Sequence, residues 1–226
     1  MKYINYIKYF FFIAFNWNIK LAFFTIRHEI KGERKYGVDT TGVANLKGDT
    51  ITDDILEHSE NYQGANYYLL EKIFDFLKNE NENSNLVDFG SGRGRILAVA
   101  AYYGFRKIIG IEISNVFARE SRINIQKIKN DFPDAEISVI EQDAIDFKIT
   151  PDQKVFFFFN PFDEITLLKV VKNILASLRS HDREIFICYI NPVHKEVFLS
   201  AGFIEVFYLE KFQYIECSIL MHTPEI

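Results

Sequence analysis

The sequence predicts an α/β fold: a seven-stranded sheet, mostly parallel with an antiparallel last strand, helices on both faces, and a helical N-terminal extension. Of the 226 residues, 48% are hydrophobic and 25% charged, which is a globular composition. From residue 86 onward, short apolar runs alternate with amphipathic helical patterns, as in parallel sheets covered by helices. The last two apolar runs, 203–210 and 212–221, are separated only by Lys211, so they must pair as an antiparallel hairpin.

The amino end is rich in aromatic residues. The run YFFFIAF, residues 9–15, is flanked by Lys2, Lys8 and Lys20 and lacks a small-residue cleavage site. It is also well short of the roughly 20 apolar residues of a membrane-spanning helix. Three alternatives remain: a helix packed on the domain or on a partner, an interfacial helix that places phenylalanines and Trp17 in a bilayer surface, or a processed or disordered tail.

Helical spacing of apolar residues predicts a further helix over 19–31, and the Gly-, Thr- and Asp-rich stretch 32–50 predicts a loop. We therefore divide the chain into an aromatic-rich extension, residues 1–60, and a domain, residues 61–226.

The elements of the domain follow from apolar periodicity and from stop signals such as Gly104, Pro133 and Gly202. Helices are expected over 65–80, 94–104, 115–132, 163–178 and 194–202. Strands are expected over 86–89, 107–113, 136–143, 155–160 and 184–190, followed by the closing hairpin. The four phenylalanines 156–159 of the fourth of these strands are expected in the core.

A glycine-rich turn, Gly90–Gly94, connects the first of these strands to the following helix. Glycines permit unusual backbone angles and leave the peptide groups open to a ligand, and a helix N-terminus offers free N–H donors. In doubly wound sheets, ligands lie beyond the carboxyl ends of the strands. The turn departs from the dinucleotide fingerprint G-x-G-x-x-G, because Arg95 stands at the sixth position. Asp88 precedes the turn, and a carboxylate beside a pyrophosphate would repel it.

The pattern D-x-G-x-G-x-G resembles the first motif of class I S-adenosylmethionine-dependent methyltransferases, which have a Rossmann-like fold. In that family the acidic residue faces the methionine ammonium of the cofactor. The resemblance implies that S-adenosyl-L-methionine is the cofactor and that the strand-end acids Glu112 and Asp143 contact its ribose and adenine. The implied cofactor-binding set is Asp88, Gly90, Ser91, Gly92, Gly94, Glu112, Ile113, Asp143, Ala144, Asn160 and Tyr67.

Asn160-Pro161-Phe162 follows the fourth of these strands and resembles the Asn/Asp-Pro-Pro-aromatic motif of amino-methylating members of the superfamily. The resemblance implies that Asn160, Pro161 and Phe162 form the catalytic set, with Asn160 orienting the acceptor nitrogen. This chain has one proline where that motif has two, which weakens any transfer of nucleobase specificity. Together with YGVDTTG upstream, these motifs look like those of a group of small bacterial methyltransferases, and DFGSGRGR also resembles a motif of some protein-lysine methyltransferases.

Simpler structural roles compete with these assignments. Glu112 is also placed to cap the helix that starts near Ser114, and Asp143 could be an ordinary strand-end acid. Asn160 before Pro161 is also a common turn former. Arg93 either meets an anionic substrate or is solvated or paired. The stretch 61–68 either covers the cofactor, with Tyr62, Gly64 or Tyr67 in contact, or packs its tyrosines in the core.

The net charge of −5 and the pI near 5.6 argue against a bulk nucleic-acid binder. Cys188 and Cys217 lie in apolar runs and indicate free buried thiols, and no zinc-type ligand spacing is present. We expect a cytoplasmic protein, with peripheral membrane contact through residues 1–30 as an option.

The predicted function is methyl transfer from S-adenosylmethionine to a nitrogen of a small molecule or a protein side chain. No catalytic base is evident from the sequence. The protein would mainly align the nucleophile, and an amine would lose its proton to a nearby carboxylate or histidine. The alternative is a non-catalytic S-adenosylmethionine or nucleotide binder that docks a partner or a membrane through its N-terminal segment.

Overall fold

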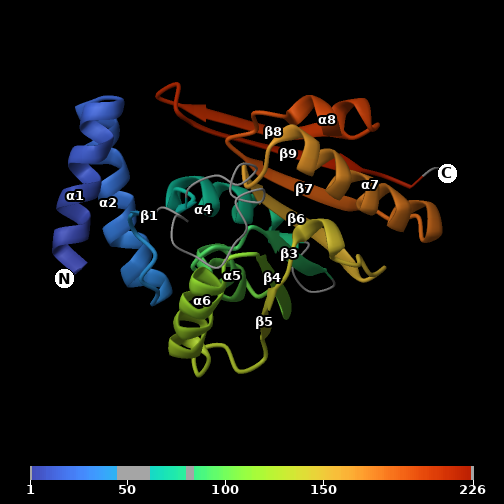
Figure 1. The fold of residues 1–226 in the computed structure, drawn as a ribbon, viewed down its shortest axis with the longest axis horizontal. Coiled ribbons are helices and arrows are strands. Elements are labelled where there is room, and N and C mark those ends of the chain that lie inside the picture. The colour runs from blue at the N-terminus through green and yellow to red at the C-terminus, as the bar shows by residue number, and fades with distance from the viewer. Residues whose placement is uncertain (1, 45–61, 80–83, 225–226) are drawn as a thin grey trace.

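The computed structural model describes residues 2–44, 62–79 and 84–224. The sheet has seven strands in the order β5-β4-β3-β6-β7-β9-β8 (Figure 1). They are β3 (Asn85–Phe89), β4 (Lys107–Glu112), β5 (Glu136–Glu141), β6 (Gln153–Phe159), β7 (Ile185–Ile190), β8 (Ile204–Lys211) and β9 (Ile215–His222). The neighbouring strands from β5 to β7 pair in parallel, whereas β9 runs antiparallel to both β7 and β8. The predicted fold class is confirmed, including the closing hairpin.

Helices cover both faces of this sheet (Figure 1). One face carries α4 (Tyr67–Phe76), extended by a short 3-10 turn, with α5 (Arg95–Tyr102) and α6 (Asn115–Ile128). The other face carries α7 (Glu164–Ser180) and α8 (Lys195–Ser200). The predicted helix over 115–132 was too long, because α6 ends at Ile128 and a turn follows before Pro133.

Strand β6 separates the two cores, because its side chains alternate between the faces. Phe157 packs in one core and stacks on Phe74, with ring centroids 5.0 Å apart. Phe156 and Phe158 pack in the other core, where Phe158 stacks on Phe89 at 5.1 Å. The prediction of a fully buried run is confirmed for these three residues. Phe159 is only half-buried and borders a cavity.

Two antiparallel helices, α1 (Lys2–Asn16) and α2 (Ile19–Tyr36), form the amino end, with α1 on the far side of α2 from the sheet (Figure 1). Short strands β1 (Val43–Ala44) and β2 (Tyr62–Gln63) pair with each other in an antiparallel arrangement. Tyr9 and Ile13 of α1 are buried, so one side of this helix packs on the rest of the chain, as the first of the three alternatives expects. Among the described helices, none combines the length and the apolar character needed to cross a bilayer.

Helix α2 is longer than predicted. The loop expected from residue 32 begins only at Gly37, which ends the helix with a left-handed φ of 71°. Gly32 lies inside the helix, and its role there is to make room for a ring. Tyr67 packs directly on the Gly32 backbone, where an added Cβ would be 2.2 Å from the ring Cγ. The predicted boundary between residues 60 and 61 lies outside the described residues.

Candidate active site

The glycine-rich turn lies between β3 and α5, where the strand order changes direction. Gly90, Gly92 and Gly94 all have left-handed φ angles, of 76°, 52° and 80°. Two of the three are also required by protein contacts. A Cβ at Gly90 would be 2.6 Å from the Cβ of Pro161, and a Cβ at Gly94 would be 2.4 Å from the Ser121 hydroxyl. The bare backbone at these two positions therefore accommodates neighbouring elements of the chain as well as the shape of the turn.

Asp88 is the most unusual group at the turn. It lies on β3, is only 1% exposed, and neither carboxylate oxygen has a hydrogen-bond partner among the described residues. Burial raises the pKa of this carboxyl well above its usual value, and the nearby Glu112 carboxylate raises it further. Buried polar groups are almost always hydrogen-bonded, so two unpartnered oxygens on one side chain point to a ligand or ordered water.

Glu112 ends β4 and holds the turn from the neighbouring strand. One of its oxygens accepts the backbone N–H of Gly92 at 2.7 Å, and the other accepts that of Ser114 at 2.9 Å. Ser114 itself caps α6 by accepting the N–H of Phe117 at 3.2 Å. Glu112 thus supports the start of the helix, as the structural alternative expected, while Ser114 is the capping residue.

Asp143 lies beyond the end of β5, the next strand along the sheet. Its carboxylate accepts the N–H of Ile145 at 2.9 Å and so caps a short 3-10 turn, Ala144–Asp146. Because β3, β4 and β5 are parallel neighbours, Asp88, Glu112 and Asp143 lie along the same end of the sheet in that order. Ile113 and Asp143 are half-buried, and Ala144 is buried.

Asn160-Pro161-Phe162 approaches the turn from the other side, because β6 pairs with β3 opposite β4. Asn160 has a left-handed φ of 38°, and its side-chain oxygen accepts the Tyr189 hydroxyl at 3.3 Å. Pro161 packs on Gly90. Phe162 is half-buried with its ring 6.4 Å from that of Phe158. The motif and the acids thus lie around the glycine turn. The left-handed φ of Asn160 also fits the simpler role of a turn former before Pro161.

The contacts of Tyr67 favour the packing alternative over contact with the cofactor. Its side chain is 1% exposed, its hydroxyl is 3.2 Å from that of Thr40, and its ring stacks on Tyr36 at 5.6 Å. The Arg95 guanidinium lies over the other side of the same ring, at 4.2 Å. The ring is therefore enclosed by its own chain, in agreement with the packing alternative.

The two arginines of the turn are both paired. Arg93 forms an ion pair with Glu120 at 2.7 Å, so its charge is matched within the chain and gives no support to binding of an anionic substrate. Arg95 is 3% exposed and binds both oxygens of Glu29, at 2.8 and 2.6 Å. It also donates to the carbonyl of Ala65 at 2.6 Å.

Sequence analysis missed the polar network around Arg95. Glu29 and Glu33 are buried on the inner face of α2. Glu33 accepts the backbone N–H groups of Thr40 and Thr41, at 2.8 and 2.7 Å, and the Tyr6 hydroxyl of α1. This network explains the YGVDTTG segment: its threonines connect the N-terminal helices to the turn.

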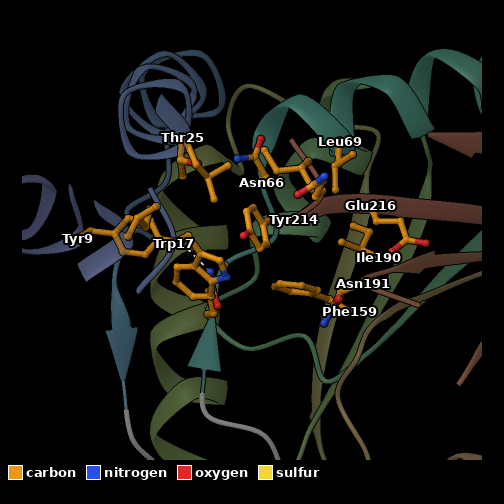
Figure 2. Close-up of a pocket in the computed structure, with 16 residues that line it drawn as sticks. Tyr9, Trp17, Thr25, Asn66, Leu69, Phe159, Ile190, Asn191, Tyr214 and Glu216 are labelled. Carbon is orange, nitrogen blue, oxygen red and sulfur yellow. Dashed lines mark hydrogen bonds between the residues drawn. The ribbon is translucent and has the colours of Figure 1, made fainter. Parts of the chain in front are cut away.

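A cavity of about 250 Å³ opens beyond the carboxyl ends of β6 and β7, against α1 and α2 (Figure 2). Four aromatic side chains and four carboxamides border it; these are Tyr9, Trp17, Phe159, Tyr214, Gln63, Asn66, Asn191 and Gln213. Among the lining residues that the structure describes, Glu216 is the only charged one, and in Figure 2 its carboxylate points away from the aromatic rings. Gly64 also lines the cavity.

Asn191 was not singled out from the sequence, although a signal existed. Asn191-Pro192 follows β7 just as Asn160-Pro161 follows β6, and both asparagines have left-handed φ angles. Because β6 and β7 are parallel neighbours, both Asn-Pro steps lie at the end of the sheet that carries the glycine turn. Within the described residues, no group of three potential ligands could hold a metal ion.

No protein-family profile and no curated protein matches the sequence. Similar folds occur among solved structures. Escherichia coli yhhF, a candidate methyltransferase, superimposes with a TM-score of 0.56 at 16% identity, over 70% of this chain and 86% of that one. Haemophilus influenzae HI0767, a candidate methylase, gives a TM-score of 0.51 at 18% identity, over 70% and 89%.

Magnesium protoporphyrin IX methyltransferase from Synechocystis PCC 6803, solved with bound S-adenosylmethionine, gives a TM-score of 0.51 at 12% identity, over 78% of this chain and 86% of that one. At these identities the likeness concerns the fold. The chain has the seven-stranded, Rossmann-like fold found in methyltransferases.

Proposed function

We propose that this protein is an S-adenosylmethionine-dependent methyltransferase that methylates a nitrogen of a small molecule or a protein side chain. The observation that carries the proposal is Asp88: a buried carboxylate with no hydrogen-bond partner among the residues that the structure describes, beside a left-handed glycine turn at the switch point of the sheet. An isolated buried charge is costly, and the ammonium of the cofactor's methionine group would offset that cost. Structures of this fold that hold S-adenosylmethionine or S-adenosylhomocysteine support the choice of cofactor.

The other strand-end acids fit the rest of the cofactor. Glu112 already orders the Gly92 peptide, and a carboxylate at the end of β4 would lie one strand from Asp88, where the ribose hydroxyls are expected. Asp143 and the backbone of Ala144 would meet the adenine, one strand further along. When bound, S-adenosylmethionine supplies an electrophilic methyl group on a sulfonium.

The cavity beyond β6 and β7 is the proposed acceptor site. Phe159 lines it and is followed directly by Asn160, so the cavity adjoins the Asn-Pro-Phe motif. No lysine, arginine or histidine is present among its described lining residues, so it lacks a partner for a phosphate or carboxylate. Aromatic faces favour an ammonium, and carboxamides hydrogen-bond neutral polar groups. These features support a neutral or cationic nitrogen acceptor.

Asn160 and Pro161 would set the geometry of transfer. Pro161 is fixed by its contact with Gly90, and the Asn160 oxygen is oriented by the Tyr189 hydroxyl. An amide oxygen held in this way would accept a hydrogen bond from a neutral acceptor nitrogen and aim its lone pair, but it would not remove a proton. An acceptor that binds as an ammonium has no lone pair, so it would first lose a proton to water. Alignment of this kind is the main contribution a protein makes to an in-line displacement.

Calorimetry tests the cofactor assignment. S-adenosylmethionine and S-adenosylhomocysteine are expected to bind the wild-type chain, and NAD is not. Asp88→Asn should lower the affinity for S-adenosylmethionine by about tenfold or more, since a charge-assisted hydrogen bond is lost. Asp131→Asn, an exposed acid on the turn after α6, is the matched control and should bind like wild type. Equal affinity of Asp88→Asn and wild type would refute the placement.

Fluorescence tests the acceptor site, because Trp17 lines the cavity and is the only tryptophan of the sequence. With S-adenosylhomocysteine bound, butylamine should change the Trp17 emission at lower concentration than butyrate of the same chain length. A stronger response to butyrate would exclude the proposed acceptor class. Once a substrate is found, Asn160→Ala should abolish methylation with cofactor affinity retained.

The second candidate function is a non-catalytic S-adenosylmethionine binder that docks through its N-terminal helices. The apolar outer surface of α1 favours it. Methylation that is unaffected by Asn160→Ala would contradict the role of Asn160, whereas cofactor binding with no transfer to any amine would favour this second function.

A further inference from the structure

Helix α1 exposes an apolar face that nothing in the chain covers among the described residues. Ile4, Ile7, Phe11 and Phe15 follow helical spacing and are 55%, 59%, 52% and 83% exposed. Phe23 of α2, 64% exposed, continues this surface through Phe10, whose ring centroid is 4.9 Å from that of Phe23. We call Ile4, Ile7, Phe11, Phe15 and Phe23 the outer face. Contiguous exposed apolar surfaces of this kind mark interaction sites.

The outer face is held in place by the opposite side of α1. Tyr9 and Ile13 are buried against the domain, and the Tyr6 hydroxyl donates to the buried Glu33 of α2. The Tyr9 hydroxyl also accepts the side-chain amide of Gln63 at 3.0 Å. The helix therefore cannot turn its apolar residues inward without breaking these contacts, and it presents them to the surroundings.

Charge identifies the partner. The first 28 residues contain Lys2, Lys8, Lys20 and Arg27 and no aspartate or glutamate, in a chain whose net charge is −5. Lys8 and Lys20 are exposed beside the outer face. An apolar helix face with aromatic residues and flanking lysines matches the boundary of a bilayer that carries anionic headgroups. A second copy of this chain would instead bring the same lysines together across a symmetric interface.

We propose that the outer face docks this protein on the surface of an anionic lipid bilayer. Phe11 and Phe15 enter the boundary between headgroups and acyl chains, and the lysines contact anionic headgroups. This docking is independent of the cofactor site and holds whether or not the protein transfers methyl groups.

Flotation of the full chain with lipid vesicles tests the proposal. The protein should bind vesicles of phosphatidylcholine mixed with phosphatidylglycerol more strongly than vesicles of phosphatidylcholine alone, and high salt should weaken the binding. The double substitution Phe11→Ser with Phe15→Ser should lower binding by about a hundredfold, at roughly tenfold for each partly inserted ring. Lys8→Glu with Lys20→Glu should remove the preference for the anionic vesicles.

The matched control is Ile123→Ser, which changes an equally exposed residue, 53%, on α6. It should float with vesicles like wild type. Because every substituted side chain is exposed, the thermal midpoints of the variants should stay near that of wild type, and circular dichroism checks this. The proposal is overturned if wild type binds neither vesicle, if Ile123→Ser loses as much binding as the phenylalanine pair, or if the outer face instead drives a dimer that Phe11→Ser with Phe15→Ser dissociates.

Discussion

Two buried carboxylates, Glu29 and Asp88, lie near the glycine turn, and they differ in the hydrogen bonds and ion pairs that they make. Glu29, 1% exposed, binds Arg95 through both oxygens and contacts the Thr41 hydroxyl at 2.7 Å. Asp88, also 1% exposed, has no hydrogen-bond partner within the described part of the chain. Arg95, the partner of Glu29, directly follows the turn, and Asp88 lies two positions before its first residue, so Arg95 and Asp88 belong to the same short segment.

The contrast separates a carboxylate that the chain itself pairs from one that we propose is paired by a ligand. Burial raises the pKa of Glu29 and the Arg95 guanidinium opposes that rise, so the chain supplies the counter-charge itself. For Asp88 the neighbouring charge is Glu112, which raises the pKa further. Folding therefore leaves the cost of burying Asp88 uncompensated, and a cationic ligand would offset it.

The largest expected effect on stability comes from breaking the buried ion pair between Arg95 and Glu29. Arg95→Met leaves Glu29 buried without its counter-charge and also removes the donors to Ala65 and Thr40. Loss of one partner of a buried ion pair should lower the free energy of unfolding by about 3–5 kcal/mol. Urea unfolding measures it, and Arg93→Met, at the more exposed pair with Glu120, should cost much less. A loss below about 1 kcal/mol for Arg95→Met would mean that the network is not structural.

The unpaired side should respond in the opposite direction. Asp88→Asn removes an unpartnered buried charge and should raise the free energy of unfolding of the ligand-free protein by about 1–3 kcal/mol at neutral pH. The effect has a defined pH dependence, because the folded pKa of Asp88 lies above its unfolded value. Wild type and variant should be nearly equal in acid, and wild type should fall behind as the pH rises from the unfolded pKa of about 3.9 toward the folded pKa.

Unfolding of both proteins across this pH range checks the sign. A variant that is less stable than wild type at neutral pH would show that Asp88 has a stabilising partner in the free protein. If the prediction holds, S-adenosylmethionine should stabilise wild type more than Asp88→Asn. The substitution would therefore raise the stability of the ligand-free protein and lower its affinity for the ligand.

Tyr67→Phe tests whether Tyr67 belongs to the structural network around Arg95 or to the cofactor site. The substitution removes the hydroxyl contact to Thr40 and keeps the ring between Tyr36 and Arg95. It should cost about 1 kcal/mol in the free energy of unfolding and leave the affinity for S-adenosylmethionine unchanged. A clear loss of cofactor affinity with stability intact would restore the original assignment of Tyr67 to the cofactor site.

The smallest expected effect on stability is at Ser91. Its hydroxyl is buried at the turn and has no partner among the described residues, like Asp88. Ser91→Ala should change the free energy of unfolding by less than about 0.5 kcal/mol, because no protein hydrogen bond is lost. If the hydroxyl contacts the cofactor, calorimetry should show weaker binding; a loss of stability above about 1 kcal/mol would instead assign it a structural partner.

Sequence alone predicted the ligand side of this comparison well. Strand–helix alternation placed Asp88, Glu112 and Asp143 at one end of neighbouring parallel strands, and the one-residue gap at Lys211 predicted the final hairpin. These features are local or follow from the chirality of parallel sheets, so spacing in the chain carries them. Which residues contact the cofactor stays a prediction.

The structural side could not be predicted. Glu29 and Arg95 are 66 positions apart and meet only because α2 packs against the start of α5. Gly32 looked like a helix end, but the Tyr67 ring that requires it comes from another helix. Tyr67 was assigned to the cofactor because the resemblance implies that residues 61–68 cover it, and the sequence gives no indication that this ring packs between α2 and Arg95.

A crystal structure of the protein with S-adenosylhomocysteine tests the central claim most directly. The account predicts the amino group of the ligand within hydrogen-bonding distance of Asp88, the ribose at Glu112, and Arg95 still bound to Glu29. A ligand bound elsewhere, with both Asp88 oxygens still unpartnered, or a diphosphate found on the glycine turn, would contradict it.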